Sequence, residues 1–187
     1  MIVGIDEVGR GCWAGPLVAA AVALAEPIPG LKDSKKLSKA QRERLSALVY
    51  EKAQATGIGW VSPVEIDQLG LTAAVRLAMR RALEAITAPY DRVIIDGNLN
   101  FLSDNPKTEA LIKADDLIPA VSAASIIAKV ARDNYMAALK GEYQKYDFAK
   151  HVGYGTALHR QLLVLHGVSD IHRRSFKPIA ALLASQA

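Results

Sequence analysis

The chain has 187 residues, of which 51% are hydrophobic and 22% are charged, so it can bury one good core in a single domain. Its formal net charge of +4 is compatible with a polyanionic partner but is too common among proteins to identify one. The single cysteine, Cys12, excludes an internal disulfide and fits a reducing compartment. The apolar run at residues 14–25 contains Pro16 and is too short to span a bilayer, so we expect a cytoplasmic protein without a membrane segment.

The first part of the chain is predicted to form a strand hairpin, a loop and a helix. Apolar and β-branched residues indicate buried strands at residues 1–5 and 17–25, which are natural hairpin partners. Residues 26–37, with two prolines and a glycine, predict a loop. A helix follows to about residue 55, and its start resembles a capping box formed by Ser38 and Gln41.

Strand and helix patterns continue along the rest of the chain. Strands are predicted at residues 57–61, 92–96 and 110–113. Helices are predicted at residues 71–86, at 120–139, after a Gly-Tyr-Gly turn at 153–155 as far as 166, and at 178–185. This order predicts an α/β fold, with a central mixed β-sheet flanked by helices and a helical C-terminal part at roughly residues 140–187.

Two adjacent acids follow the first predicted strand. Residues 4–11 read Gly-Ile-Asp-Glu-Val-Gly-Arg-Gly, which places Asp6 and Glu7 at the end of a buried strand. Burying carboxylates without partners costs several kcal/mol, and a divalent cation is the usual compensation. The glycines beside Arg10 allow a backbone to approach a ligand closely. The motif therefore suggests phosphate chemistry beside a metal.

Further acids follow two later strands. Asp96 ends one predicted strand, and Asp115 and Asp116 follow the next. Ligand sites in open α/β sheets form at such edges, and carboxylates that converge there suit Mg²⁺ or Mn²⁺. Two such ions about 4 Å apart serve in-line displacement at phosphorus. The alternative, in which each acid independently caps a helix or ends a strand, stays open for any single acid but is much less favoured for the set.

Six segments of the chain, in this order and spacing, resemble bacterial ribonuclease HII, the type 2 ribonuclease H. They lie at residues 4–11, 33–37, 95–98, 118–129, 153–156 and 172–176, and so cover nearly the whole chain. The resemblance implies an RNase H-like fold in one catalytic domain over residues 1–187. It also implies a metal-dependent endonuclease that hydrolyses the RNA strand of RNA–DNA hybrids. Such an enzyme also cuts 5′ to ribonucleotides embedded in duplex DNA and leaves 5′-phosphate and 3′-hydroxyl ends.

The resemblance further implies which acids are catalytic and bind two divalent ions, Mg²⁺ or Mn²⁺: Asp6, Glu7, Asp96 and one of the pair Asp115 and Asp116. Counting back from Pro119 selects Asp115. The family pattern at this point is Lys-Gly-Asp, then a small residue, then often a basic one. Here Asp116 and Leu117 occupy the last two positions, which adds negative charge close to the predicted site.

Two elements resemble those with which the family reads the ribose. Gly9, Arg10 and Gly11 match the element whose backbone contacts the 2′-hydroxyl, the group that distinguishes RNA from DNA. Tyr154 matches the tyrosine that packs against the sugar next to the junction. An ordinary turn at the glycines and a core-packed turn residue at Tyr154 are the structural alternatives.

Two groups of residues are predicted to contact phosphates. The first is a loop that holds Ser34, Lys35 and Lys36. The second is a pair near a predicted helix N-terminus, Ser122 and Ser125, which fit helix caps equally well.

The remaining polar residues are not predicted to be catalysts. Arg173 and Arg174 are expected to make backbone or structural contacts, and the four scattered histidines are expected to be exposed or to cap helices. Cys12 is expected to be a small buried residue, because no histidine partner is near it in the sequence.

The sequence leaves two alternatives to this function. Ribonuclease HIII usually carries an extra N-terminal substrate-binding domain, whereas this chain begins directly on the catalytic strand. A non-catalytic nucleic-acid-binding module is disfavoured by the complete set of acids. The expected partners are therefore RNA–DNA hybrids and DNA duplexes with embedded ribonucleotides; no membrane partner is expected, and nothing in the sequence requires more than a monomer.

Overall fold

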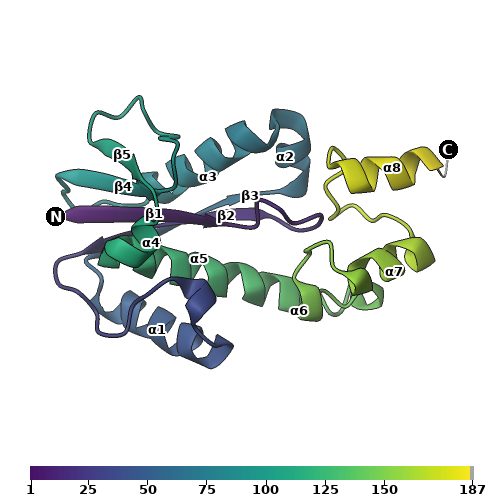
Figure 1. Cartoon of the computed structure of the whole chain (residues 1–187), viewed down its shortest axis with the longest axis horizontal. Helices are drawn as coiled ribbons and strands as arrows, with labels where there is room; N and C mark the ends of the chain where they lie inside the picture. The colour runs from purple at the N-terminus through teal and green to yellow at the C-terminus, as the bar shows by residue number, and fades with distance from the viewer. Residues whose placement is uncertain (186–187) are drawn as a thin grey trace.

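The computed structural model describes residues 1–185, which contain a five-stranded sheet with helices on both faces (Figure 1). The strands are β1 (Ile2–Val8), β2 (Leu17–Leu24), β3 (Ala55–Val61), β4 (Arg92–Asp96) and β5 (Thr108–Leu111). Their order across the sheet is β3-β2-β1-β4-β5. β2 runs antiparallel to β1 and β3, whereas β1, β4 and β5 run parallel to one another. The predicted mixed sheet is confirmed.

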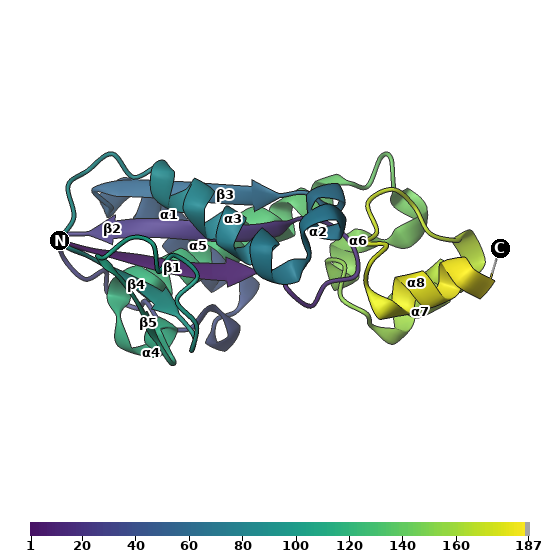
Figure 2. The same cartoon turned by 90° about the horizontal axis from the view of Figure 1, so that it is seen from above.

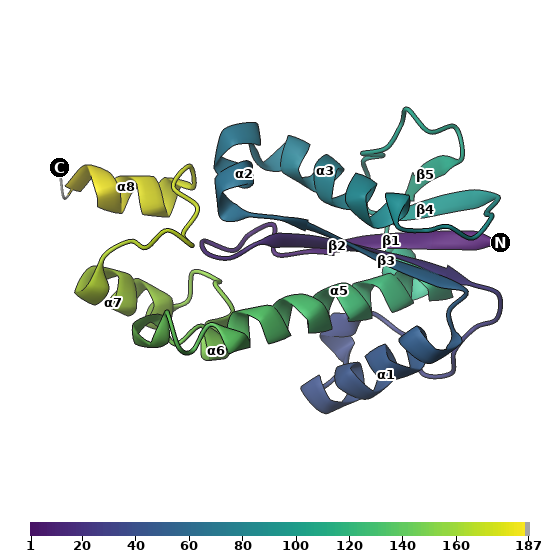
Figure 3. The same ribbon diagram turned by 180° about the vertical axis from the view of Figure 1, so that it is seen from behind.

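The helices divide into two layers and a separate C-terminal group. They are α1 (Lys39–Lys52), α2 (Pro63–Leu69), α3 (Leu71–Glu84), α4 (Ala114–Leu117), α5 (Pro119–Ala138), α6 (Phe148–His151), α7 (Ala157–His166) and α8 (Lys177–Ser185). Two single 3₁₀ turns, η1 (Ser34–Lys36) and η2 (Gln144–Tyr146), complete the elements. α2 and α3 cover one face of the sheet, and α5 covers the other with α1 packed against it (Figure 3). α6, α7 and α8 lie beyond one end of the sheet (Figure 2).

The side-chain pattern of β1 explains why a helix fits on each face. Val3 and Ile5 are fully buried in the core that α3 covers. Gly4 points to the opposite face, where an added Cβ would lie 2.2 Å from the backbone of Ala120. α5 can cross β1 this closely only because position 4 has no side chain. The next residue on that face is Asp6, so the strand carries a carboxylate to the edge of the α5 layer.

Two local differences from the sequence prediction affect the acids. β1 continues to Val8, because its pairing with β2 extends as far as Val8 opposite Val18. Asp6 and Glu7 therefore lie within the strand rather than after it. Asp115 and Asp116 belong to the short helix α4, which has too few residues to show helical periodicity in the sequence.

Three of the four histidines are buried, so the expectation of exposed or capping positions is wrong for them. His151, His159 and His172 are at most 5% exposed and lie together in the C-terminal group. Their scattered positions in the sequence gave no sign of this cluster. In the described part of the chain, no helix has the length and apolar character needed to cross a bilayer.

Candidate active site

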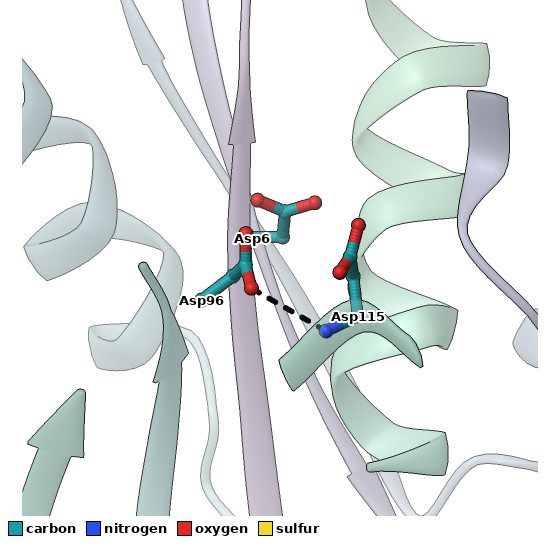
Figure 4. A group of neighbouring side chains, drawn as sticks. All are labelled: Asp6, Asp96 and Asp115. Carbon is teal, nitrogen blue, oxygen red and sulfur yellow. Dashed lines mark hydrogen bonds between the residues drawn. The ribbon is translucent and has the colours of Figure 1, made fainter. Parts of the chain in front are cut away.

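Three carboxylates from three different elements meet at one edge of the sheet (Figure 4). Asp6 lies on β1 and Asp96 ends β4, and the pairing of Ile5 with Ile95 places these two acids side by side. Asp115 reaches the same place from α4, and its backbone N–H donates to Asp96 Oδ1 over 3.4 Å. One carboxylate oxygen from each residue lies within 4.8 Å of the other two.

The surroundings of Asp6 and Asp115 disfavour the charged forms of these two acids. Burial raises the pKa of Asp6 well above its usual value, and the neighbouring charge of Glu7 raises it further. Burial also raises the pKa of Asp115, with a further contribution from Asp96. Within residues 1–185, no lysine or arginine forms a salt bridge with any of the three acids.

This donor set fits a divalent cation. Hard cations such as Mg²⁺ and Mn²⁺ prefer carboxylate oxygens, and they supply the positive charge that buried, unpaired acids lack. The three oxygens are close enough to share one ion. The geometry therefore supports a divalent metal site at Asp6, Asp96 and Asp115.

Glu7 stands apart from these three acids. It follows Asp6 on β1, so its side chain leaves the opposite side of the strand. Its Oε1 accepts a hydrogen bond from Arg10 Nη1 over 3.1 Å. Burial nevertheless raises the pKa of Glu7, because it outweighs the attraction of Arg10. Glu7 still lines the same cleft as Asp6 and Asp96.

A cleft of about 380 Å³ opens beside the acids. It brings together most of the predicted substrate contacts with three of the four predicted metal ligands, whereas Asp115 lines a neighbouring pocket with Asp96 and Lys35. The lining of the cleft comprises Asp6, Glu7, Val8, Gly9, Arg10, Gly11, Ser34, Lys35, Asp96, Ser125, Lys129 and Tyr154. Thus the glycine-flanked arginine, Tyr154 and part of the predicted phosphate loop surround a single space.

Two predicted substrate contacts are absent from this lining and have partners within the protein. Lys36 Nζ contacts both carboxylate oxygens of Asp116, at 2.6 and 2.7 Å. The buried Ser122 hydroxyl donates to the Asp115 carbonyl over 2.6 Å, and so it fixes the backbone that carries a predicted ligand. By contrast, Ser125 faces the cleft and shares a 2.9 Å hydrogen bond with Ser34.

Lys129 is a cleft residue that sequence reasoning did not single out. It follows Ser125 by four residues on α5, so the two share one face of the helix, and this spacing was the available signal. Its ammonium lies 5.8 Å from the centre of the Tyr154 ring and 2.8 Å from Asp133 Oδ1. Lys129 therefore places an ammonium group, paired with Asp133, on the side of the cleft that Tyr154 lines.

The sequence of the chain is similar to those of known ribonucleases HII. The family model for ribonuclease HII matches residues 3–179. Ribonuclease HII of Dichelobacter nodosus is 51% identical over 186 residues, which cover 98% of this chain and 97% of that protein.

Solved structures agree with the sequence comparison. The ribonuclease H2 of Pyrococcus horikoshii aligns with a TM-score of 0.83 at 27% identity, over 98% of this chain and 97% of its own. Bst-RNase HIII in complex with Mn²⁺ aligns with a TM-score of 0.75 over 98% of this chain and 69% of its own, and its 22% identity shows the common fold alone. With an acidic site at the sheet edge and a relative that is half identical along nearly its whole length, the chain belongs to the ribonuclease HII family of metal-dependent endonucleases.

Proposed function

We propose that this protein cuts on the 5′ side of ribonucleotides embedded in duplex DNA and also hydrolyses the RNA strand of RNA–DNA hybrids, leaving 5′-phosphate and 3′-hydroxyl ends. The observation that carries the proposal is the composition of one cleft. Its lining combines unpaired acids, Asp6 and Asp96, with a glycine-rich backbone at residues 9–11 and the half-exposed ring of Tyr154. Acids suited to metal-assisted phosphodiester hydrolysis thus lie beside groups suited to contact a sugar.

Asp6, Glu7, Asp96 and Asp115 are the residues that would hold two divalent ions, either Mg²⁺ or Mn²⁺. When bound, such ions lower the pKa of the attacking water and neutralise charge on the leaving 3′-oxygen. The Mn²⁺ complex of Bst-RNase HIII, a protein of the same fold, supports a divalent metal in this class of protein. Glu7 differs from the other three in its salt bridge with Arg10, which engages its Oε1.

The remaining cleft residues bind and orient the substrate in this proposal. Gly9 has a φ of +92°, a conformation that side chains other than glycine rarely adopt, and it turns the backbone of residues 9–11 into the cleft. That backbone contacts the ribose 2′-hydroxyl, and Tyr154 packs against the adjoining sugar. Lys35 and Lys129 contribute positive charge for the phosphates.

The test is cleavage of an end-labelled DNA duplex that contains one ribonucleotide, with Mg²⁺, with Mn²⁺ and with a chelator. The matched control is the same duplex without the ribonucleotide. We expect one metal-dependent cut 5′ to the ribonucleotide and none in the all-DNA duplex. Cutting of a long RNA–DNA hybrid alone would remove the junction-reading roles of Tyr154 and residues 9–11. Efficient cutting of the all-DNA duplex would contradict ribose recognition, and no cutting of any duplex would favour a binding module.

A further inference from the structure

Two fully buried arginines, Arg132 and Arg173, lie beneath the cleft. Both side chains are 0% exposed, and neither forms a salt bridge with an acid in residues 1–185. The Nη2 atom of Arg173 has no hydrogen-bond partner at all. Burying a guanidinium without an acidic partner is unfavourable, so an apolar side chain would fill the same space at a lower cost in stability. The presence of two such groups calls for a role that an apolar side chain cannot perform.

Their hydrogen bonds identify that role. All of them end on main-chain carbonyls, and most of these carbonyls belong to residues 9–16, which connect β1 to β2 and which we call the reading loop. Arg132 donates to the carbonyls of Pro16 at 2.8 Å, Ala14 at 3.1 Å and Val152 at 2.8 Å. Arg173 donates to the carbonyls of Gly15 at 3.0 Å and Arg10 at 3.2 Å.

The reading loop lies in direct contact with Arg132. A Cβ added to Gly9 would lie 2.4 Å from Arg132 Nε. A Cβ added to Gly153 would lie 3.4 Å from Arg132 Nη2 and 2.3 Å from the Ala14 carbonyl oxygen. Gly153 precedes Tyr154, so one guanidinium supports both parts of the cleft that face the sugar in the proposed function.

Backbone contacts join the same segments. The Trp13 N–H donates to the Gly153 carbonyl over 2.8 Å, and the Arg173 N–H donates to the Trp13 carbonyl over 2.8 Å. Cys12 also forms an isolated β-bridge with Tyr154. The reading loop is thus held by segments that lie more than 100 residues further along the chain, and it is not merely a turn between two strands.

We propose that Arg132 and Arg173 are positioning residues for ribose recognition: their guanidinium groups hold the carbonyls of the reading loop and of Val152, and so fix the backbone that reads the 2′-hydroxyl. The inference rests on the proposed function, because it concerns the same cleft. Arginine suits this task, since its planar group directs five N–H donors along fixed directions, whereas lysine carries three donors on one nitrogen. Neither arginine touches the substrate itself.

The test compares binding of two duplexes that differ only in one ribonucleotide. Dissociation constants are measured by fluorescence anisotropy with Ca²⁺, under conditions in which the duplexes stay intact. The variants Arg132→Lys and Arg173→Lys keep the positive charge but lose the forked donors. We expect each to weaken binding of the ribonucleotide duplex by about tenfold, equivalent to the loss of one or two hydrogen bonds. Binding of the all-DNA duplex, which depends mainly on phosphate contacts, should change by less than about twofold.

A matched control separates positioning from general loss of stability. Met79 is fully buried in the core that α3 covers, away from the reading loop, so Met79→Ala should lower the stability of the fold without changing the preference for the ribonucleotide. Lysine variants that fold, as shown by circular dichroism, and keep the wild-type preference would overturn the inference. So would an equal loss of preference in Met79→Ala.

A second measurement uses the unmodified protein and does not depend on the folding of any variant. The amide hydrogens of Trp13 and Gly15 donate to the carbonyls of Gly153 and Ile171. If the arginines hold the reading loop, these two amide hydrogens should exchange as slowly as those of β1. Exchange as fast as in the surface loop around residue 104 would overturn the inference. Absence of ribonucleotide preference in the wild-type protein would instead contradict the proposed function, and hydrogen exchange would then still report whether the loop is held.

Discussion

Asp6 carries a carboxylate into a position on β1 that is only 8% exposed, beside Glu7 and Asp96. Burial raises its pKa in the folded protein above the ordinary value that it has in the unfolded chain. Between these two pKa values the folded protein binds more protons than the unfolded chain, so its stability without metal falls as the pH rises through that interval. A bound cation reverses this penalty, since it interacts favourably with the charged form.

Replacing Asp6 with asparagine should therefore have opposite effects on stability and on catalysis. Asp6→Asn removes the penalty of the buried charge, and we expect the melting temperature of the metal-free protein at neutral pH to rise by a few degrees, equivalent to about 1 kcal/mol. The stabilisation by Mg²⁺ or Mn²⁺ should shrink, and cleavage should be lost. Thermal unfolding in chelator and in Mg²⁺ measures the first two effects.

An exposed acid provides the control for this experiment. Asp104 pairs with Arg80 at the surface, where the guanidinium holds the pKa of the carboxyl below its usual range. Asp104→Asn should leave both the metal response and cleavage unchanged. Wild-type turnover by Asp6→Asn would contradict the assignment of Asp6 as a catalytic ligand.

The sequence was informative about these residues to different degrees. Asp6 and Asp96 could be predicted to meet, because each closes or follows an apolar strand of one sheet. The separation of Glu7 from Asp6 could not be predicted, because it depends on β1 continuing past both acids. Whether Lys36 faces the cleft also depends on tertiary structure. Its ammonium group instead donates to Asp116, which lies 80 residues further along the chain.

At the scale of elements, the turn η1 is held at two points on either side of the acids. Ser34 is linked to Ser125 on α5, and Lys36 is linked to Asp116 on α4. Both side chains of the second link are partly exposed to solvent, which screens the pair, so the link contributes little to stability. Its larger effect is electrostatic. Asp116 puts a negative charge next to Asp115, and its ion pair with Lys36 engages an ammonium group that is otherwise available to bind a phosphate.

Removal of Asp116 should therefore strengthen substrate binding. For Asp116→Ala we expect KM for the ribonucleotide duplex to fall a few-fold at low salt, with kcat little changed, and the gain to shrink as salt is added. Asp104→Ala, which breaks a surface pair far from the cleft, is the matched control. A rise in KM for Asp116→Ala would instead show that the ion pair serves mainly to hold η1 in place.

The buried histidines form a directional chain of hydrogen bonds. The Ser169 N–H donates to His172 Nδ1 over 3.1 Å, so the proton of the neutral ring lies on Nε2. That nitrogen faces His159 Nε2 at 3.1 Å, and His159 Nδ1 then donates to the Tyr154 carbonyl at 3.0 Å. A charged His159 would place a proton on both Nε2 atoms, and a charged His172 would place one on Nδ1, where the Ser169 N–H donates, so these hydrogen bonds require both rings to be neutral.

The hydrogen bonds between these histidines predict that the protein is less stable in acid. Burial lowers the pKa of His159 and His172 to about 4, whereas the ordinary value is 6.5. Between those pKa values the unfolded chain binds more protons than the folded protein. The stability that the neutral histidines contribute is therefore complete above about pH 6.5 and is lost as the pH falls towards 4. We expect His159→Gln to lower the free energy of unfolding at pH 7 and the difference from wild type to shrink as the pH falls. Urea unfolding across this range measures it, and a difference that grows in acid would contradict the assignment.

At the scale of the whole molecule, small residues in the sheet set the distance to both helical layers. Gly4 lies against the backbone of α5, and Gly59 lies against α3, where an added Cβ would come within 1.9 Å of the Ala78 carbonyl oxygen. Neither contact can be relieved by rotating a side chain, because the obstacle is backbone. The sequence predicted the layers from the strand and helix patterns, but which glycines lie under a helix depends on where the helices cross.

The closeness of α5 to β1 can be tested at Gly4. Gly4→Ala should destabilise the protein by about 3 kcal/mol or more, because the methyl group must displace the start of α5 from the strand that carries Asp6. The matched control is Gly141→Ala, where an added Cβ meets nothing within 4 Å. Equal unfolding free energies for the two variants in urea would show that α5 can move without cost.

The hydrogen-bond partners of the reading loop lie late in the sequence, which affects the order in which parts of the structure form during synthesis. β1 and β2 can pair soon after both have left the ribosome, since they are neighbours in the sequence. The loop between them obtains its last partner only when Arg173 has emerged. A nascent chain thus has all four predicted metal ligands, the last at Asp115, well before the reading loop has all of its hydrogen-bond partners. Under the proposed function, discrimination between RNA and DNA is therefore completed late in synthesis.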